Sequence, residues 1–133
     1  MSNKIDKILA EISAGELFDK ITILEIKKAR ISNKEKLNDI NKELSSLNET
    51  VKKFIPDQSS ISKYINDLKD INLKLWDIED GKRAAEKNKK FDEKFIEFAR
   101  SVYKCNDVRS KLKLQINQLS GSNLQEVKQY TEY

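Results

Sequence analysis

Residues 91–119, FDEKFIEFARSVYKCNDVRSKLKLQINQL, carry the pattern that decides the fold. Mostly apolar side chains recur there at alternating steps of four and three residues, the heptad spacing of a helix that packs lengthwise against other helices. These seam positions are Phe91, Phe95, Phe98, Val102, Cys105, Arg109, Leu112, Ile116 and Leu119. Small and apolar residues also lie off the seam, so we expect a central helix that several neighbours bury. Arg109 stands where an aliphatic side chain is typical, and we expect it to have a partner inside the protein.

The composition favours long helices around a narrow core. Hydrophobic residues make up 38% and charged residues 36% of the 133 residues, a length typical of one domain. Three Gly and one Pro leave few places for tight turns, which argues against many short strands. The 26 basic and 22 acidic residues are interleaved, as on a solvated helix surface, and nothing in their order predicts a nucleic-acid interface.

The N-terminal half predicts a short segment followed by two helices. Residues 1–12 have the apolar spacing of a short helix, with a brief strand as the alternative. Residues 13–16 (SAGE) form a capping box that starts a helix, and residues 32–35 (SNKE) repeat this pattern. The apolar register shifts at the second box, so residues 14–55 form either two helices or one helix with a stutter, and we expect the break. Pro56 ends the second helix.

The C-terminal half predicts two further heptad helices. Residues 57–60 (DQSS) form the clearest loop and lead into the first of them. Its seam positions are Ile61, Tyr64, Leu68, Ile71, Leu75 and Ile78. Gly81 indicates a close helix crossing or a kink in its continuation, and Gly121 predicts a left-handed stop after the last helix. The tail, residues 120–133, is apolar enough to dock back on the bundle.

These elements predict an all-α fold with residues 1–133 as a single domain. We expect about four helices, arranged as an antiparallel helical bundle or as paired helical hairpins with heptad-type, coiled-coil packing. An elongated structure with so thin a core would gain stability from dimerisation, so we also expect a homodimer.

The chain lacks the residues that many classes of catalytic site need. It has no His, the commonest metal ligand and general base, and it has no phosphate-binding loop and no nucleophile with a base. A carboxylate site at Asp77, Glu79 and Asp80 is disfavoured, because neighbouring carboxylates on a helix point apart. We therefore predict no catalytic residue, metal or cofactor. The single Cys105 on the seam suits a reduced, cytoplasmic protein, and no apolar run is long enough to predict membrane insertion.

Six residues on the last two predicted helices form the candidate binding site. They are Trp76, Glu79, Arg83, Tyr103, Asn106 and Arg109. Arginine is the cation best suited to planar contacts with a carboxylate or a phosphate, and Glu79 and Arg83 lie one helical turn apart. The favoured interpretation is structural: Glu79, Arg83, Asn106 and Arg109 form a partly buried network, walled by Trp76, that fixes helix register. A pocket for an anionic small molecule is the alternative.

Several blocks of the chain resemble the motifs of an uncharacterised family of small proteins, a domain of unknown function. They are residues 13–27 (SAGELFDKITILEIK), 75–80 (LWDIED), 95–103 (FIEFARSVY) and 106–109 (NDVR), so the resemblance covers nearly the whole chain. It implies a single domain, and an association with bacterial surface-polysaccharide loci and with marine bacteria and their phages. It implies no reaction and no ligand. The residues that belong to its motifs are Gly15, Glu16, Asp19, Lys20, Trp76, Glu79, Asp80, Arg100, Tyr103, Asn106, Asp107 and Arg109.

The function that we expect is that of a non-enzymatic, cytoplasmic helical interaction protein, whose partner is a second copy or another protein. An accessory role in surface-glycan assembly follows from the resemblance alone. The alternative is a binding protein or an enzyme that recognises an anionic small molecule, such as a nucleotide sugar or a sugar phosphate, between helices. A pocket that holds Arg83 or Arg109 together with Trp76 would favour the alternative, whereas direct pairing of these polar groups would favour the interaction protein.

Overall fold

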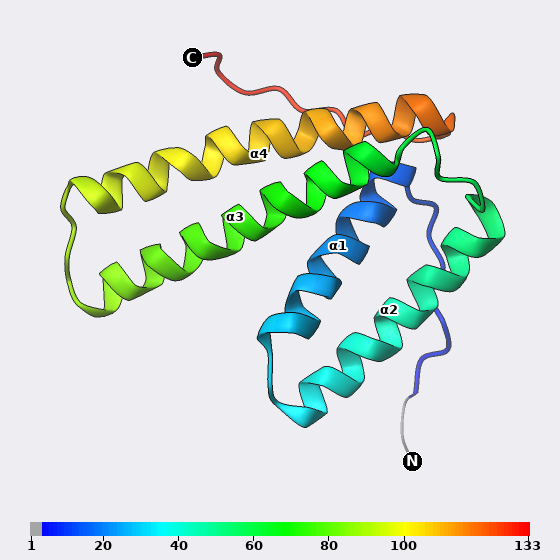
Figure 1. Cartoon of the computed structure of the whole chain (residues 1–133), viewed down its shortest axis with the longest axis horizontal. Coiled ribbons are helices and arrows are strands. Elements are labelled where there is room, and N and C mark those ends of the chain that lie inside the picture. Colours follow the sequence, from blue (N-terminus) through cyan, green and yellow to red (C-terminus); the bar gives the residue numbers. More distant parts are fainter. Residues whose placement is uncertain (1–3) are drawn as a thin grey trace.

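The computed structural model describes residues 4–133, and all the regular elements in this range are helices. They are α1 (Ala14–Arg30), α2 (Lys34–Phe54), α3 (Ser62–Lys87) and α4 (Glu93–Ser120) (Figure 1). The all-α class and the four helices are therefore confirmed, and the expected break within residues 14–55 falls at residues 31–33. Residues 4–12 form neither the short helix nor the brief strand, and residues 1–3 of that predicted element lie outside the described part.

Two antiparallel hairpins, α1–α2 and α3–α4, cross to form the bundle (Figure 1). α1 packs against all three other helices, whereas α2 packs against α1 alone. The central helix is therefore α1, and the prediction that several neighbours bury the helix over residues 91–119 is wrong for its N-terminal half. Buried side chains of α4 begin at Cys105, and Ile96 is 54% exposed. The heptad pattern continues into a region where α3 is the only neighbouring helix.

Local side chains explain where the first two helices begin. Ser13 caps α1, because its hydroxyl accepts a hydrogen bond from the Glu16 amide at 3.1 Å. The Glu16 carboxylate does not complete the capping box, since it points to α4 instead. At α2 the cap is Asn33, which accepts from the Lys36 amide at 3.0 Å, one residue later than the repeated box predicts.

Glycine and proline end two of the helices as the sequence predicts. α2 stops at Phe54, two residues before Pro56, because the residue preceding a proline disfavours the helical conformation. α4 ends at Gly121, whose φ of 69° is left-handed and costs little at a residue without a Cβ atom. Ser122 then donates its amide proton back to the Asn117 carbonyl oxygen at 2.9 Å, which closes the end of the helix.

The hydrophobic core lies where α1 crosses the other helices. Its buried members are Ala14, Leu17, Phe18, Ile21, Leu24, Ile40, Leu44, Val51, Ile61, Leu68 and Ile116. α1 supplies five of these residues, because it is hydrophobic on more than one flank and contacts all three other helices. Leu68 and Ile116 have no exposed surface at all, so the deepest part of the core lies where α3 and α4 meet α1.

Gly15 allows α1 and α4 to approach each other closely. A Cβ atom at residue 15 would lie 2.5 Å from the Lys113 carbonyl oxygen and 2.9 Å from Oδ1 of Asn117. Gly15→Ala should therefore lower the free energy of unfolding by about 1–3 kcal/mol through overpacking, despite the higher helix propensity of alanine. Urea denaturation measures the change. Lys20→Ala, at an exposed site on the same helix, is the control, and a Gly15→Ala protein as stable as this control would contradict the close approach.

The outer part of the α3–α4 hairpin, residues 79–104, projects beyond the other two helices and is called the arm (Figure 1). The last buried residue of α3 is Ile78, and the first of α4 is Cys105, so the arm contains no fully buried side chain. Gly81 lies at a close crossing of α3 and α4, the first of the two alternatives for this residue, because a Cβ atom there would lie 2.6 Å from the Phe98 ring.

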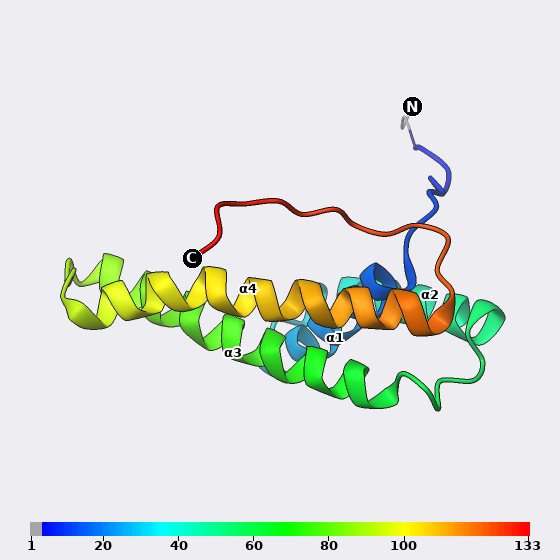
Figure 2. The same cartoon turned by 90° about the horizontal axis from the view of Figure 1, so that it is seen from above.

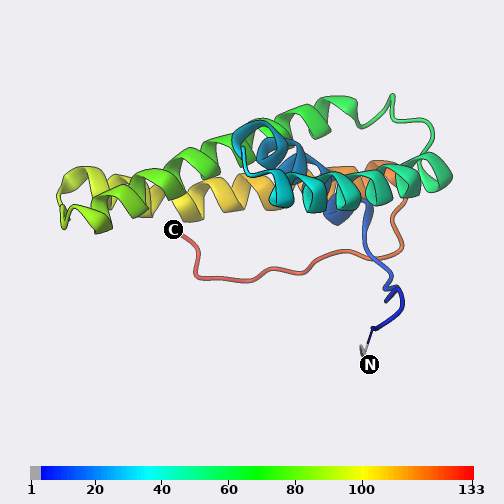
Figure 3. The same ribbon diagram turned by 90° about the horizontal axis from the view of Figure 1, so that it is seen from below.

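The two ends of the described chain lie on the same side of the bundle. The tail begins one residue later than predicted, since Ser120 still belongs to α4. Residues 121–133 run back along α4 toward the arm, and residues 4–12 leave α1 on that side (Figures 2 and 3). A hydrogen bond of 2.7 Å from Asn123 to Glu11 joins the two segments. Among the helices in residues 4–133, none has the length and the apolar character that crossing a membrane requires.

Candidate functional site

Arg109 meets its partner at the centre of the bundle, and that partner is Asp19 of α1. Nε of Arg109 donates to Oδ1 of Asp19 at 2.8 Å, and a second guanidinium nitrogen donates to Oδ2 at 2.5 Å. The Asp19 side chain is 2% exposed and the Arg109 side chain is 30% exposed. This is a bidentate ion pair with a buried carboxylate, the geometry for which arginine is better suited than lysine.

A third helix completes the surroundings of the Asp19 carboxylate. Asn72 of α3 donates to Oδ1 of Asp19 at 3.0 Å and to the Thr22 hydroxyl at 3.1 Å. The Thr22 hydroxyl in turn donates to the Asp19 carbonyl oxygen at 2.9 Å. Asn72 and Thr22 are buried, so the polar network lies inside the crossing of α1, α3 and α4. Within residues 4–133, no buried side-chain nitrogen or oxygen lacks a hydrogen-bond partner.

Lys113 extends the network by one helical turn toward the tail. Its ammonium donates to Glu16 of α1 and to Glu126 of the tail, at 2.8 Å in each case. The Lys113 side chain is only 10% exposed, whereas those of Glu16 and Glu126 are 36% and 54% exposed. A buried ammonium needs such carboxylate partners, because leaving it without them would cost several kcal/mol.

The pairing changes the proton affinity of these groups. Burial by itself raises the pKa of Asp19, but the hydrogen bonds from Arg109 and Asn72 outweigh it, so the pKa lies below the usual value of 3.8. Burial lowers the pKa of Lys113, but its bonds to Glu126 and Glu16 outweigh burial and raise the pKa above 10.5. The bond from Lys113 lowers the pKa of the Glu126 carboxyl. All these groups are therefore charged at neutral pH.

The N-terminal turn of α1 is also tied to α4 and the tail. The Gly15 amide donates to Oδ1 of Asn117 at 2.6 Å, and the Ala14 amide donates to the Ser122 hydroxyl at 3.1 Å. Together with the Ser13 cap, these bonds satisfy the first amides of the helix. The N-terminus of α1 therefore has its leading donors in use and does not offer them to an external anion.

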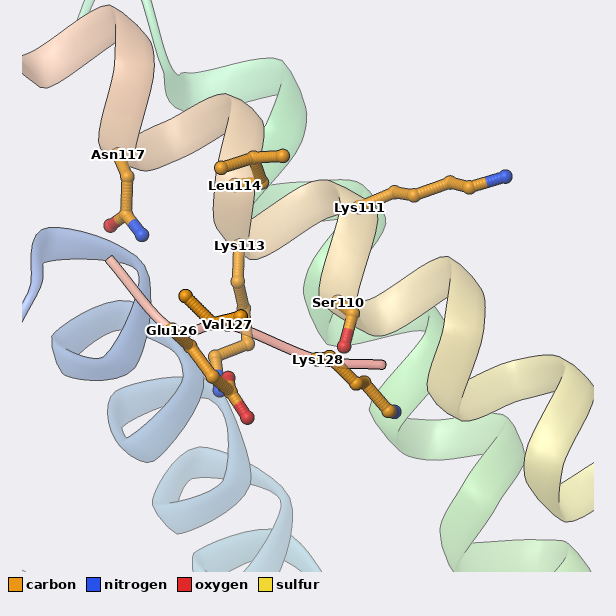
Figure 4. Close-up of a pocket in the computed structure, with 8 residues that line it drawn as sticks. All are labelled: Ser110, Lys111, Lys113, Leu114, Asn117, Glu126, Val127 and Lys128. Carbon is orange, nitrogen blue, oxygen red and sulfur yellow. The ribbon is translucent and has the colours of Figure 1, made fainter. Parts of the chain in front are cut away.

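Two pockets adjoin the Lys113 side chain. The polar pocket, of about 260 Å³, is lined by Glu16, Asn106, Arg109, Ser110, Lys113, Glu126 and Lys128. The tail pocket, of about 330 Å³, lies between α4 and the tail (Figure 4). Its lining residues are Ser110, Lys111, Lys113, Leu114, Asn117, Glu126, Val127 and Lys128. Four residues line both pockets, so they are neighbouring parts of one open, mixed-charge groove beneath the tail.

The six residues predicted for the binding site do not gather in one place. Asn106 accepts a long hydrogen bond of 3.4 Å from Arg109, so these two are brought together as expected. Arg83 is 82% exposed on the arm and lies 3.9 Å from Glu79, which is its own neighbour on α3. The expected network of Glu79 and Arg83 with Arg109 does not form, because Asp19 takes the guanidinium.

The two aromatic residues of the predicted site lie away from the Arg109 pocket. Trp76 is half-buried on α3 and does not line the polar pocket. Tyr103 is 43% exposed and packs edge-on against Tyr133 of the tail, with 5.1 Å between ring centroids. Cys105 is buried with a free thiol, as its place on the seam predicts.

A family model covers residues 8–132 of this chain, and its description is "Family of unknown function (DUF6165)". The chain belongs to this family. The resemblance to an uncharacterised family is thereby confirmed at this coarser level. No curated protein and no solved structure matches the chain. Membership of DUF6165 brings no reaction or ligand with it, so an account of function rests on the chain's own geometry.

Six members of the network were absent from the predicted site: Glu16, Asp19, Thr22, Asn72, Lys113 and Glu126. Asp19 had a signal in the sequence, because Gly15, Asp19, Thr22 and Ile26 follow one another at steps of four, three and four. That spacing is a second heptad seam on α1, with a charged residue at one of its positions. Asn72 and Lys113 lie beside seam positions among many polar residues, and no comparable pattern marks them.

Proposed function

We propose that this member of DUF6165 is a non-enzymatic helical interaction protein that acts as a homodimer. The observation that carries the proposal is the arm, in which two helices project without a third layer to cover them. No side chain of residues 79–104 is fully buried, and Phe91 and Ile96 are each more than half exposed. Helices that are amphipathic along their length normally bury an apolar stripe against further helices.

A second copy of the arm has the properties of the missing layer. Two such hairpins packed side by side make a four-helix arrangement, in which each supplies the apolar surface that the other lacks. Basic and acidic side chains are both present in short, interleaved groups along residues 79–104, so two arms can pair without accumulating charge of one sign. An arm with a uniform charge would instead repel its copy.

The saturated polar network supports a non-enzymatic role. Asp19 and Arg109 bond to each other, and Asn72 and Thr22 fill the remaining positions around the carboxylate. Groups that are paired in this way fix the register of α1, α3 and α4, as single polar residues do in coiled seams. A cytoplasmic location and an accessory role in surface-glycan assembly belong to the same proposal, the first supported by the free thiol and the second by the family resemblance alone.

Sedimentation equilibrium at micromolar concentration tests the dimer. The expected mass is twice the 15.5 kDa of one chain. Ile96→Glu places a charge at the centre of the proposed contact and should weaken association at least about tenfold, since a buried unpaired charge is costly. The matched control is Val127→Glu, which changes an exposed residue of the tail and should leave the mass unchanged. A wild-type mass of one chain would reject the homodimer, and dissociation by Val127→Glu alone would move the contact to the tail.

The second candidate is a protein that binds an anionic small molecule, such as a sugar phosphate or a nucleotide sugar. The polar pocket favours it, because Arg109, Lys113 and Lys128 line a space of about 260 Å³. This pocket lies on the tail side of Arg109 and does not include Trp76 or Arg83. Its volume is close to the lower limit for ligand pockets, about 300 Å³, which favours a small ligand over a nucleotide sugar.

A further inference from the structure

Lys113 holds two carboxylates that differ in how firmly they are attached. Glu16 belongs to the first turn of α1, where the helix and the core fix its position. Glu126 belongs to the tail, which has no regular structure and whose residues beyond Ser122 are all exposed. The two bonds to Lys113 have the same length of 2.8 Å. Glu126 therefore occupies an acceptor position beside a buried ammonium without being part of the rigid bundle.

Polar contacts hold most of the tail on α4. Beyond Glu126, the Tyr133 hydroxyl donates to Asp107 at 2.6 Å, and the Tyr133 ring lies against Tyr103. Val127 and Tyr130 are 91% and 76% exposed, so their side chains add little burial. Lifting the middle of the tail exposes little apolar surface, and exposed polar contacts of this kind contribute little free energy. The carboxylate of Glu126 can therefore exchange with another one.

The charges that remain in the groove after Glu126 has left determine which ligand can take its place on Lys113. Arg109 is balanced by Asp19, and Lys113 is balanced by Glu16, so the rigid part of the site is neutral. Lys128 lines both pockets, but it belongs to the tail and leaves together with Glu126. A group with a single negative charge restores the balance that Glu126 gives. A phosphate dianion would leave an excess negative charge beside Glu16.

We propose that the groove beneath the tail binds a small carboxylate, which takes the place of Glu126 on Lys113. The Ser110 hydroxyl points toward the tail in the same groove and can donate a further hydrogen bond (Figure 4). Glu16 is an acceptor at the other edge of the site, so the ligand carries a hydroxyl or ammonium group as well. The ligand is thus a small hydroxy acid or amino acid, and Glu126 competes with it for Lys113. This inference deepens the second candidate function and rests on it.

Amide NMR titration of the whole chain with sodium lactate is the test. We expect the signals of Ser110, Lys113 and Asn117 to shift in a saturable manner. Those of the tail near Glu126 should move toward the positions of a disordered chain, because the tail is released. Sodium chloride at the same ionic strength is the control for screening, and glucose 6-phosphate is the second ligand.

Two variants identify the competitor and the cation. Glu126→Gln should bind lactate about tenfold more tightly, the gain expected if the tail is closed in nine molecules of ten. Glu132→Gln, on the same tail, is the matched control and should leave the affinity unchanged. Lys113→Met should abolish the saturable shift, whereas Lys104→Met, at an exposed site on the same helix, should not. Release of the tail is measured in the wild-type protein. It therefore tests the proposal even if the Lys113→Met variant does not fold.

The outcomes separate this inference from the second candidate function. Saturable binding of lactate that Glu126→Gln strengthens supports the inference. Tighter binding of glucose 6-phosphate than of lactate would overturn the carboxylate assignment while leaving the second candidate in place. A response to neither ligand in Glu126→Gln would overturn both.

Discussion

Arg109→Leu should lower the free energy of unfolding by about 3–5 kcal/mol at neutral pH, the cost of leaving one member of a buried ion pair alone. The loss arises mainly at Asp19, whose side chain is 2% exposed, because water cannot replace the guanidinium there. Arg109 is 30% exposed, so its own removal from the pair contributes less, and the leucine that replaces it adds some apolar contact. Urea denaturation monitored by circular dichroism measures the change.

The pH dependence of this loss identifies its cause. In the wild-type protein the pKa of Asp19 is lower in the folded state than the usual 3.8, so the stabilisation is present above about pH 4 and is lost as pH falls through the folded-state pKa. In Arg109→Leu the lowering contact is gone and burial raises the pKa of Asp19. Acidification then protonates Asp19 in the folded state, and the difference in stability between variant and wild type should shrink from pH 7 to pH 4.

Arg83→Leu is the matched control for this prediction. Arg83 is 82% exposed and lies 3.9 Å from Glu79, so its removal should change the free energy of unfolding by less than about 0.5 kcal/mol. An Arg109→Leu protein as stable as the Arg83→Leu control at both pH values would mean that the pair fixes helix register without contributing stability. Complete unfolding at pH 7 would show that the network is essential to the fold.

The sequence predicts the helices of this protein more reliably than their packing. Capping residues, Pro56 and Gly121 act within one helical turn, so their effect can be derived without knowledge of the fold. The heptad seam of residues 91–119 also predicts that one face of α4 is apolar. It does not say how far along the helix a partner extends, and α1 covers only the part beyond Cys105. The position of that crossing depends on Gly15, whose role appears only when α1 and α4 are placed together.

Because the sequence does not give the packing of the helices, only part of the candidate site could be predicted. The place of Arg109 on a seam predicts a buried polar partner, and the partner exists. Its identity depends on the hairpin crossing, which brings Asp19 to a residue 90 positions later in the chain. Glu79 is much closer in sequence, but it lies on the arm beyond the point where α1 crosses α3. The charged residue on the seam of α1 marks Asp19 as a candidate partner, but only the crossing of the hairpins shows which seam residues meet.

In the proposed dimer, stability and association depend on different parts of the molecule, the first on the polar network and the second on the arm. The polar network and the core lie together where α1 meets α3 and α4, so that end of the hairpin is held without a partner. The arm consists of α3 and α4, and Tyr133 of the tail contacts it at Tyr103. Changes near the crossing should therefore alter folding, whereas changes on the arm should alter association and leave the fold of one chain intact. Two isoleucines on the same helix separate these effects.

Ile116→Ala should lower the free energy of unfolding by about 2–5 kcal/mol, the range for truncating a buried isoleucine. Ile116 has no exposed surface and belongs to the core cluster beneath α1, so the deleted methyl groups leave a cavity that rigid neighbours cannot fill. The matched control is Ile96→Ala, the same substitution on the same helix at a residue that is 54% exposed. Thermal and urea denaturation at several protein concentrations measure both variants.

Comparing the two variants at several protein concentrations also tests whether the arm is the dimer contact. Ile116→Ala should lose the same free energy at every concentration, because the core belongs to one chain. Ile96→Ala should change stability by less than about 0.5 kcal/mol in dilute solution, where a chain is alone. Near the association midpoint it should lose more, since a partner that binds only the folded state adds stability in proportion to its occupancy. A loss at Ile96 that is large and independent of concentration would mean that the arm is buried within one chain, and the proposed dimer contact would then be wrong.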